Sequence, residues 1–401
     1  MLRYLFADMN SFFASVEQQE TGLTGPIAVV PMANVDTTCV IAANYEAKAY
    51  GVGTGTAVHE AKKLCPTLKL IEARPQVYVE YHHRIVEAME RCIHVDHVCS
   101  IDELYGRLMG EERKPDHAAV IAYRIKAAFR EAVGPRIRCS IGLAPNAWLA
   151  KVASDMQKPD GLTMILAEQM PEALYRLKLT DLPGIASGMA RRLANFGVLH
   201  TFQLCALTER QLADVWGSKV LGSIWWNQLR GKDLPYRPTQ RRMVGHSHVL
   251  PPELRTDAKA RAVLVRMIHK AAARMRRLGY WAMRLTVQVE HLGAPGWEKN
   301  FSLGLCRDTI TMVDALASVW RLRPPAVPLR VGVTLSQLVA NRSAELPLFA
   351  DQVRRSALAD AMDRINRRYG RDAVYSAAMM GAEQSAPTRI SFTQIPTLDE
   401  F

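Results

Sequence analysis

Short apolar runs alternate with segments of helical spacing through the first 170 or so residues of the chain. Residues 2–8, LRYLFAD, are rich in strand formers and end on an acid, and residues 9–19, MNSFFASVEQQ, have apolar positions at helical spacing. Residues 27–33 and 39–52 contain similar runs, and HVCSIDELYGRL and RCSIGLAPN flank a long helical segment. This alternation predicts a first domain of the α+β or α/β class.

The pattern changes twice in the remainder of the chain. Residues 171–232 form short helical segments broken by Gly and Pro, and GKDLPYRPTQRR (231–242) is typical of a linker. A strand, a helix at 257–278, two strands, a helix at 308–320 and a last strand then follow. This β-α-β-β-α-β order predicts one antiparallel sheet covered by two helices. An amphipathic helix and polar coil come after residue 340.

The charge of the chain favours a polyanionic partner. The 401 residues carry 51 Lys and Arg against 39 Asp and Glu, a formal net charge of +12. Residues 230–290 contain 14 basic and 4 acidic residues, so 14 minus 4 leaves +10 of that excess in the linker and the last domain. Nucleic acid is the partner that such a surface indicates, although a basic surface can also serve solubility alone.

Nothing in the sequence predicts a membrane segment. The apolar start, MLRYLFADMNSFF, runs quickly into polar residues, and no stretch reaches the roughly 20 apolar residues of a membrane span. The 7 cysteines form no CxxC pair, so neither a zinc ribbon nor a disulfide framework is indicated. We expect a cytoplasmic protein without membrane contact.

Three acids lie at the ends of predicted strands. Asp8 ends the first strand, and Asp102 and Glu103 end another. If the strands are neighbours, the three carboxylates converge and repel one another unless divalent cations neutralise them. Hard oxygen donors in an open site suit Mg²⁺. On spacing alone, solvated acids at strand ends or a helix cap remain the commoner explanation.

Four blocks of the sequence resemble the signature blocks of one family. FADMNSFFASVEQ, NYEAKAYGV, SIDELY and CSIGLAPNAWLAKVASDMQKPDG are similar, in order and spacing, to blocks of the Y-family (translesion) DNA polymerases of the DinB and UmuC group. The resemblance implies an α+β multidomain right hand. Its expected parts are a palm at 1–172 with fingers inserted at about 22–76, a helical thumb at 173–232, a linker and βαββαβ little finger at 233–340, and a tail at 341–401.

The resemblance also implies a metal-dependent chemistry. Asp8, Asp102 and Glu103 match the metal-binding acids of the palm, and the backbone carbonyl of Met9 is a further ligand. Two Mg²⁺ ions, for which Mn²⁺ is a possible substitute, would serve phosphoryl transfer from a dNTP to a primer on template DNA. Such an enzyme is expected to have low fidelity and to act on damaged templates.

Four further residues match nucleotide contacts of the family. Phe13 falls on the steric gate, a ring that clashes with a ribose 2′ hydroxyl, although an amphipathic helix would bury such a ring in any case. Tyr45 and Lys48 match triphosphate contacts of the fingers, and Lys158 matches a basic residue of the palm. Many members carry Arg where Lys48 stands, and Lys keeps the charge without the two-pronged geometry of a guanidinium.

Two other segments resemble binding motifs. LPGIASGMARRLANFGV (182–198) is similar to a helix-hairpin-helix, whose amides grip a DNA phosphate; Gly184 and Ile185 form the hairpin, and an ordinary helical turn is the alternative. Arg241 and Arg242 of the linker are further candidate DNA contacts. AELPLFAD (344–351) resembles the sliding-clamp peptide of bacteria, with Leu346, Leu348 and Phe349 as its apolar anchors, although these residues can also fold back onto the little finger.

Two other functions fit parts of the same pattern. A catalytically inactive relative that binds DNA and the clamp as a mutagenesis scaffold would lack the metal acids, whereas all three are present here. A metal-dependent nuclease would use carboxylates and a DNA-gripping motif as well. The block around Tyr45 and Lys48 speaks against the nuclease because it suits a triphosphate.

Overall fold

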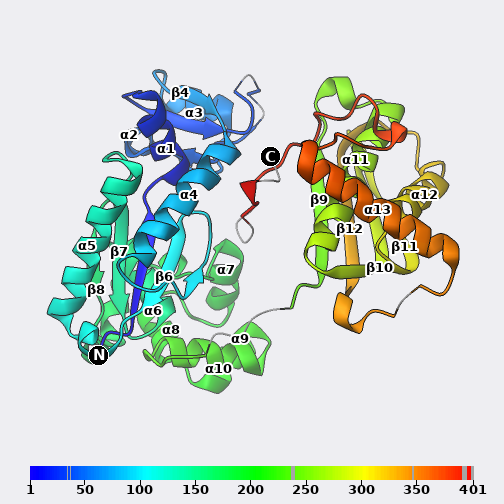
Figure 1. The fold of residues 1–401 in the computed structure, drawn as a ribbon. Coiled ribbons are helices and arrows are strands. Elements are labelled where there is room, and N and C mark those ends of the chain that lie inside the picture. Colours follow the sequence, from blue (N-terminus) through cyan, green and yellow to red (C-terminus); the bar gives the residue numbers. More distant parts are fainter. Residues whose placement is uncertain (34, 37, 236–239, 346, 391–394, 399–401) are drawn as a thin grey trace. The chain divides into compact units, whose positions relative to one another are not determined.

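The computed structural model describes all residues from 1 to 401 except 34, 37, 236–239, 346, 391–394 and 399–401. It divides into two compact units (Figure 1). The first consists of Met1–Tyr236 with Arg389–Leu398, and the second consists mainly of Arg237–Thr388. Mixed sheets and helices in separate units confirm the predicted α+β multidomain class.

A five-stranded sheet forms the centre of the first unit. Its strand order is β5-β6-β1-β7-β8, and β1 pairs antiparallel with both of its neighbours. All six residues of β1 are buried, which agrees with its apolar sequence YLFADM. Helices α4 and α5 pack against each other, and α6 packs on β1 and β7. The strands are β1 (Tyr4–Met9), β5 (His97–Val98), β6 (Glu103–Arg107), β7 (Cys139–Ala144) and β8 (Leu162–Met164), and the helices are α1 (Phe12–Thr21), α4 (Pro75–Glu90), α5 (Pro115–Val133) and α6 (Ala147–Met156).

A smaller sheet of order β3-β2-β4 lies between α1 and α4 in the sequence. Helix α1 contacts β2 and β3, and a small core that includes Val30, Val40 and Val58 holds the elements together. The side chain of Asn44 caps α2 by accepting from the Ala47 N–H at 2.9 Å. The elements are β2 (Ile27–Val30), β3 (Ala42–Ala43), α2 (Tyr45–Ala49), α3 (Val58–Leu64) and β4 (Lys69–Glu72).

Short helices complete the first unit, as the Gly and Pro pattern predicts. Their buried face shares one core with α6 and the central sheet, in which the rings of Trp148 and Trp225 lie 5.4 Å apart. This shared core fixes the helices to the end of the sheet. The helices are α7 (Ser187–Asn195), α8 (Thr201–Ala206), α9 (Glu209–Trp216) and α10 (Lys219–Gln228).

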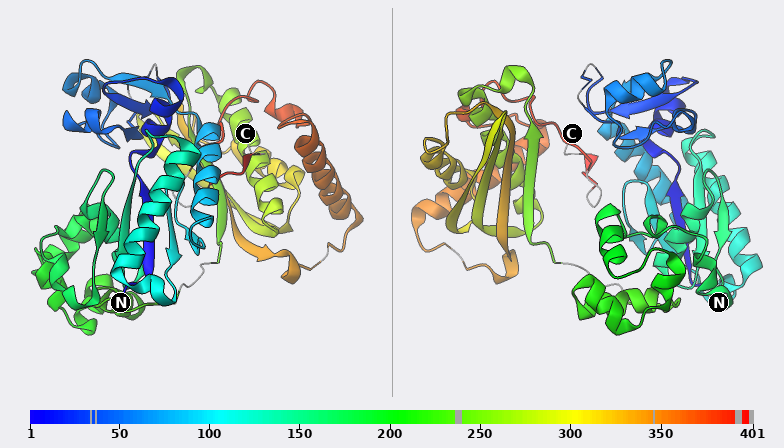
Figure 2. Two further views of the ribbon diagram at one scale, coloured as in Figure 1. Left: turned by 60° about the vertical axis from the view of Figure 1, so that its left-hand side comes forward. Right: turned by 180° about the vertical axis from the view of Figure 1, so that it is seen from behind.

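The second unit contains the predicted β-α-β-β-α-β order. Its four strands form an antiparallel sheet of order β11-β10-β12-β9, and the helices lie on one face of this sheet (Figures 1 and 2). Alternate residues of β10, such as Leu285, Val287 and Val289, are buried beneath α11 and α12. The elements are β9 (Met243–Val249), α11 (Asp257–Arg277), β10 (Tyr280–His291), β11 (Ala294–Cys306), α12 (Thr309–Trp320) and β12 (Pro328–Ala340).

The segment after residue 340 is attached to this unit through two buried arginines of α11. Arg276 pairs in a two-pronged geometry with Asp363 of α13 (Ala350–Tyr369), through N–O distances of 2.6 and 2.8 Å. Arg266 is fully buried and lies 2.6 Å from Asp372, which follows α13. The charge count for residues 230–290 places both arginines on a polyanion-binding surface. For these two residues that interpretation is wrong, because each is paired with an aspartate inside the unit.

Within the residues that the structure describes, no helix combines the length and the apolar character that crossing a membrane requires.

The buried pair predicts a stability change with a matched control. Asp363→Ala leaves the Arg276 guanidinium buried without its carboxylate, so we expect the second unit to lose about 3 kcal/mol of unfolding free energy. Asp360→Ala removes the partner of Arg307, a more exposed pair, and should cost about 1 kcal/mol or less. Urea unfolding, with hydrogen exchange of the α13 peptides, measures both. Equal losses in the two variants would contradict the structural role of Arg276.

Candidate active site

Two strands bring the predicted acids to one place. Asp8 and Glu103 are opposed residues of the antiparallel pair β1 and β6. The prediction that Asp102 and Glu103 end a strand is wrong: Glu103 begins β6, and Asp102 lies in the bend before it. Because the pair is antiparallel, the start of β6 lies beside the end of β1. Met9, the last residue of β1, donates its N–H to the Asp102 carbonyl at 2.9 Å.

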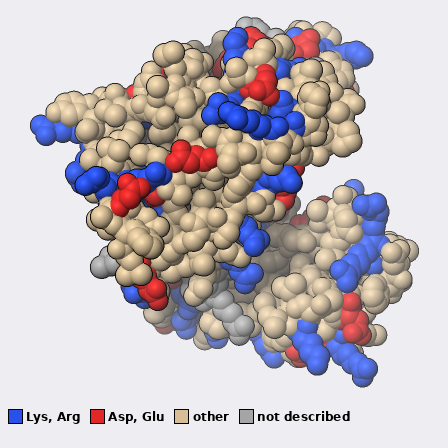
Figure 3. All heavy atoms as spheres, turned by 90° about the vertical axis from the view of Figure 1, so that its right-hand side faces the viewer, with Lys and Arg blue, Asp and Glu red and all other residues tan. Residues whose placement is uncertain are grey.

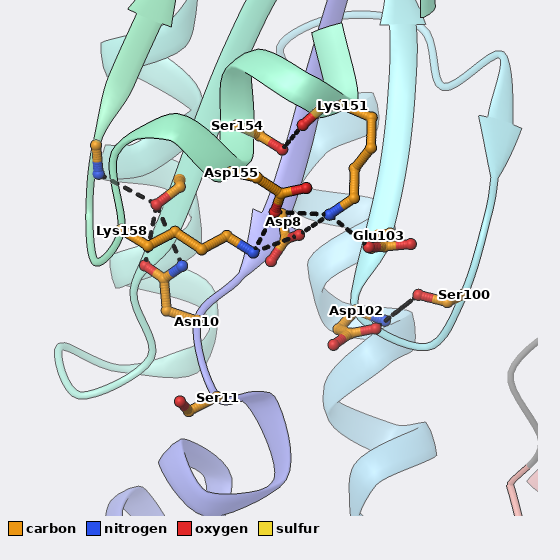
Figure 4. A network of polar contacts seen from close by, with 12 residues as sticks. Asp8, Asn10, Ser11, Ser100, Asp102, Glu103, Lys151, Ser154, Asp155 and Lys158 are labelled. Atoms are coloured by element: carbon orange, nitrogen blue, oxygen red, sulfur yellow. Dashed lines mark hydrogen bonds and ion pairs between the residues drawn. The ribbon is translucent and has the colours of Figure 1, made fainter. Parts of the chain in front are cut away.

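The carboxyl of Asp102 is held apart from the other two. It accepts a hydrogen bond from the Ser100 hydroxyl at 2.6 Å (Figure 4). Burial raises the pKa of Asp102 to about 6, and the charges of Asp8 and Glu103 act in the same direction, while the Ser100 hydrogen bond opposes them. The charge of Asp102 is therefore costly here until a cation arrives.

Two lysine amines lie among the acids (Figure 4). The Lys151 amine contacts Asp8 Oδ2 and lies 2.7 Å from Glu103 Oε1 and 3.0 Å from Asp155 Oδ1. The Lys158 amine lies 2.8 Å from Asp8 Oδ2 and 2.7 Å from Asp155 Oδ1. Burial lowers the pKa of each lysine, but the surrounding carboxylates outweigh this effect and raise it overall. Both amines are therefore charged.

Sequence reasoning missed Lys151 and Asp155, although both lie in the fourth signature block. Their spacing of four residues puts them on one face of α6, and this spacing was the signal available. The side chain of Asn146 caps α6 by accepting from the Leu149 N–H at 2.7 Å. Asn10 accepts from the Asp160 N–H at 2.7 Å, and so fixes the loop that carries Lys158 beside β1.

Carboxylate oxygens of this kind suit a hard divalent cation, although the acids are not arranged around one point. Among the described residues, no three His, Cys, Asp or Glu side chains are grouped as a metal ion requires. The lysine amines lie between the carboxylates (Figure 4). Asp8 and Glu103 nevertheless bring carboxylate oxygens to adjacent strand ends, and their charges add to the burial that raises the pKa of Asp102.

Phe13 lies in α1, one turn beyond β1, where a buried network holds its ring. The ring stacks on that of Tyr78 of α4 with centroids 4.4 Å apart. Tyr78 donates its hydroxyl to Glu17 at 2.7 Å, and the fully buried Glu17 also pairs with Arg74 at 2.6 Å. Phe13 is thus a half-buried residue with a fixed orientation, and not a freely rotating side chain.

Tyr45 and Lys48 lie in α2 and reach toward the same strand end. The Lys48 amine donates to the Ser11 hydroxyl at 2.8 Å and lies 4.5 Å from the centre of the Tyr45 ring. Burial lowers the pKa of Lys48, the charge of Lys158 lowers it further, and Asp8 opposes both. The structure therefore brings Lys48 and Lys158 into one electrostatic environment with Asp8.

The predicted hairpin lies before α7. Gly184 has a φ of +98°, and a Cβ there would lie 3.1 Å from the Trp225 ring, so this position requires glycine. Ile185 is buried, and its N–H donates to the Leu182 carbonyl at 3.0 Å. The amide of Ile185 is therefore already used by the turn.

The remaining predicted contacts lie in the second unit. Arg241 and Arg242 come just before β9. Leu348 is 93% exposed, and Phe349, at the N-terminus of α13, is 69% exposed. Leu346 lies outside the described residues.

Two family models match the sequence. That of the impB/mucB/samB family matches residues 7–155, and that of the C-terminal domain of the same family matches residues 241–348. Together these matches span more than half of the chain and include every acid of the site.

Several relatives are similar over nearly their whole length. DNA polymerase IV of Moorella thermoacetica is 32% identical over 94% of this chain and 96% of its own length. DNA polymerase IV of Pelotomaculum thermopropionicum is 30% identical over 94% and 95%, and DNA polymerase IV 2 of Bacillus subtilis is 28% identical over 94% and 95%.

Solved structures share the fold. A Y-family DNA polymerase chimera of Dbh and Dpo4 matches 85% of this chain and 100% of its own, with a TM-score of 0.71 and 24% identity. An insertion ternary complex of Dbh DNA polymerase matches the same shares with a TM-score of 0.57 and 25% identity.

Proposed function

The chain belongs to the Y-family DNA polymerases, and on that basis we propose that it extends a primer on damaged template DNA with low fidelity, by two-metal phosphoryl transfer. It is a DNA-directed DNA polymerase of the DinB-like group. The observation that carries the proposal is the opposition of Asp8 and Glu103 in the β1 and β6 pair, with Asp102 directly before Glu103. A scaffold without catalysis has no need of this arrangement.

Polymerases of this family use divalent metal ions, and we infer that this chain binds two Mg²⁺, with Mn²⁺ as a substitute. Asp8, Asp102, Glu103 and the carbonyl of Met9 would hold them. When bound, such ions lower the pKa of the primer 3′ hydroxyl and neutralise charge on the triphosphate. The residues of the chain supply the oxygen ligands and keep them at one strand end, through the register of β1 and β6.

The dNTP would lie between α2 and the strand end. Lys48 and Lys158 supply positive charge for the triphosphate, and Tyr45 adds a hydroxyl donor. In the structure Lys48 contacts Ser11 and Lys158 contacts Asp8, at 2.8 Å each. The ring of Phe13, held by Tyr78, would lie against the sugar and exclude a 2′ hydroxyl.

Primer-template DNA would be held through its phosphates. Lys and Arg outnumber Asp and Glu on the face that Figure 3 shows, in agreement with the net charge of +12. Contacts from the hairpin at Gly184 and Ile185, together with Arg241 and Arg242, would be independent of base sequence. Because Ile185 uses its own N–H in the turn, Gly184 is the better candidate for an amide contact.

The exposed Leu348 and Phe349 support binding to a sliding clamp in the cytoplasm. This peptide lies between two ordered elements, because β12 ends at Ala340 and α13 begins at Ala350. Two apolar side chains exposed to this extent have few contacts to lose within the unit when they enter an apolar pocket.

Removal of two acids tests the catalytic assignment. Asp102→Ala with Glu103→Ala takes away two of the three carboxylate ligands, so we expect primer extension with Mg²⁺ and dNTPs to fall by more than about 1,000-fold. Gel analysis of a labelled primer measures this. As a control, the double variant should still bind primer-template DNA, with an affinity that falls as salt rises. Extension that survives the double change would refute the site.

Removal of the gate ring tests the nucleotide pocket. Phe13→Ala takes away the group that would meet a ribose 2′ hydroxyl, so incorporation of ribonucleotides relative to deoxynucleotides should rise by about 100-fold or more. Single-nucleotide kinetics with dCTP and rCTP measure the ratio. Phe12→Ala changes a neighbouring buried ring of α1 and serves as the control. If both variants retain the wild-type ratio, Phe13 is a core residue only.

Loss of the two exposed side chains tests the clamp contact. Leu348→Ala with Phe349→Ala should weaken binding to a bacterial sliding clamp by about 10-fold or more, because each is an anchor in an apolar pocket. Surface plasmon resonance measures the affinity, and Val353→Ala, which truncates an exposed residue of α13, is the matched control. Unchanged binding in the double variant would place the contact elsewhere.

A further inference from the structure

Two acids of the candidate site, Asp8 and Glu103, are paired with an amine of the chain itself. The Lys151 amine touches one oxygen of Asp8, one of Glu103 and one of Asp155, and its side chain is 19% exposed. A buried carboxylate cluster is stable only when positive charge lies within it. Lys151 supplies that charge from within the chain.

The amine and a metal ion need the same ligands. Asp8 and Glu103 are the two opposed residues of the strand pair that would hold a cation, and Lys151 lies between their carboxylates (Figure 4). An ammonium group and a divalent cation both attract these oxygens and repel each other. Metal ligation by both residues therefore requires the amine to move.

Asp155 gives the amine a place to go. It lies four residues after Lys151 on α6, and its Oδ1 is 3.0 Å from the amine. Asp155 also holds Lys158 at 2.7 Å. Lys158 is the residue that would turn to the triphosphate. Once it does, Lys151 is the one of these two lysines that still contacts Asp155.

We propose that Lys151 is a place-holding cation: it occupies the space between Asp8 and Glu103 in the metal-free enzyme and withdraws to Asp155 when divalent cations enter. This inference rests on the proposed metal site of the polymerase. Lys151 is a positioning residue in this scheme, since it prepares the ligands without contacting the reacting atoms. The carboxylates of Asp8 and Glu103 thereby keep their positions between catalytic cycles.

Metal binding in the absence of DNA and nucleotide is the direct test. Lys151→Met removes the competing charge, so the variant should bind Mn²⁺ at least about 5-fold more tightly than wild type, which is the lower range of coupling between two competing ligands. Electron paramagnetic resonance of free Mn²⁺ measures the affinity. Lys126→Met, which removes a lysine paired with Asp160 outside this cluster, should leave it unchanged.

The same variant should be less stable without metal. In EDTA Glu103 loses its paired amine, and Asp8 and Asp155 are left with Lys158 alone, so Lys151→Met should unfold at a lower temperature than wild type. Added Mn²⁺ should narrow the gap because tighter binding stabilises more. Lys151→Gln, which retains polar contacts, is the second variant if Lys151→Met does not fold. Wild-type or weaker Mn²⁺ affinity in a folded variant overturns the proposal.

A double-mutant cycle tests the resting place. Asp155→Asn weakens Mn²⁺ binding in the wild-type background both by removing a nearby charge and by leaving Lys151 without a partner. In the Lys151→Met background only the first effect remains, so the loss should be smaller. Equal losses in both backgrounds would overturn the role of Asp155.

Primer extension by the wild-type enzyme separates the two levels of inference. If wild type extends a primer and the affinities do not change as described, the place-holder is refuted while the polymerase assignment stands. If the affinities change as described and wild type does not extend a primer, the metal site and the place-holder stand while the proposed reaction fails.

Discussion

Negative charge concentrated at one end of two adjacent strands is the constraint on which this enzyme is built. The register that opposes Asp8 and Glu103 brings two carboxylates together, and the same register would be unstable without positive charge between them. The chain supplies this charge from Lys151 of α6 and Lys158 of the following loop, while Lys48 of α2 contacts Ser11 just beyond β1. Local hydrogen bonds stabilise the elements that carry these lysines. Asn146 caps α6, and Asn44 caps α2.

The elements themselves could be predicted from the sequence because their apolar periods are clear. The strand at residues 2–8, the long helix before RCSIGLAPN and the whole β-α-β-β-α-β order appear in the structure where the pattern puts them. The direction of the strand at Asp102 could not be predicted from the sequence. The pattern of CSIDELY indicates one continuous strand, whereas the chain turns within it at residues 99–102. Periodicity alone does not reveal a bend whose hydrogen bonds are made by Ser100 and Asp102.

Only part of the candidate site could be predicted from the sequence. Residues that match a family block, such as Phe13 and Lys48, could be named without a structure, but their partners could not. Tyr78 stacks on Phe13 and bonds to Glu17, from which it is 61 residues away, and no local pattern predicts these contacts. Lys151 and Asp155 had the opposite difficulty: their helical spacing is visible, but a lysine and an aspartate one turn apart are also common on solvated helices. The contacts of Lys151 with Asp8 and Glu103, and of Asp155 with Lys158, distinguish them.

The buried arginines of α11 affect how the chain folds during synthesis. Arg266 and Arg276 leave the ribosome about 100 residues before Asp372 and about 90 before Asp363, their partners in the finished unit. Until then α11 cannot reach its native burial without two uncompensated charges. The named strands and α-helices of the first unit all precede residue 236 and meet no such delay. A nascent chain can therefore form the sheets of the first unit before the two arginines of α11 find their partners.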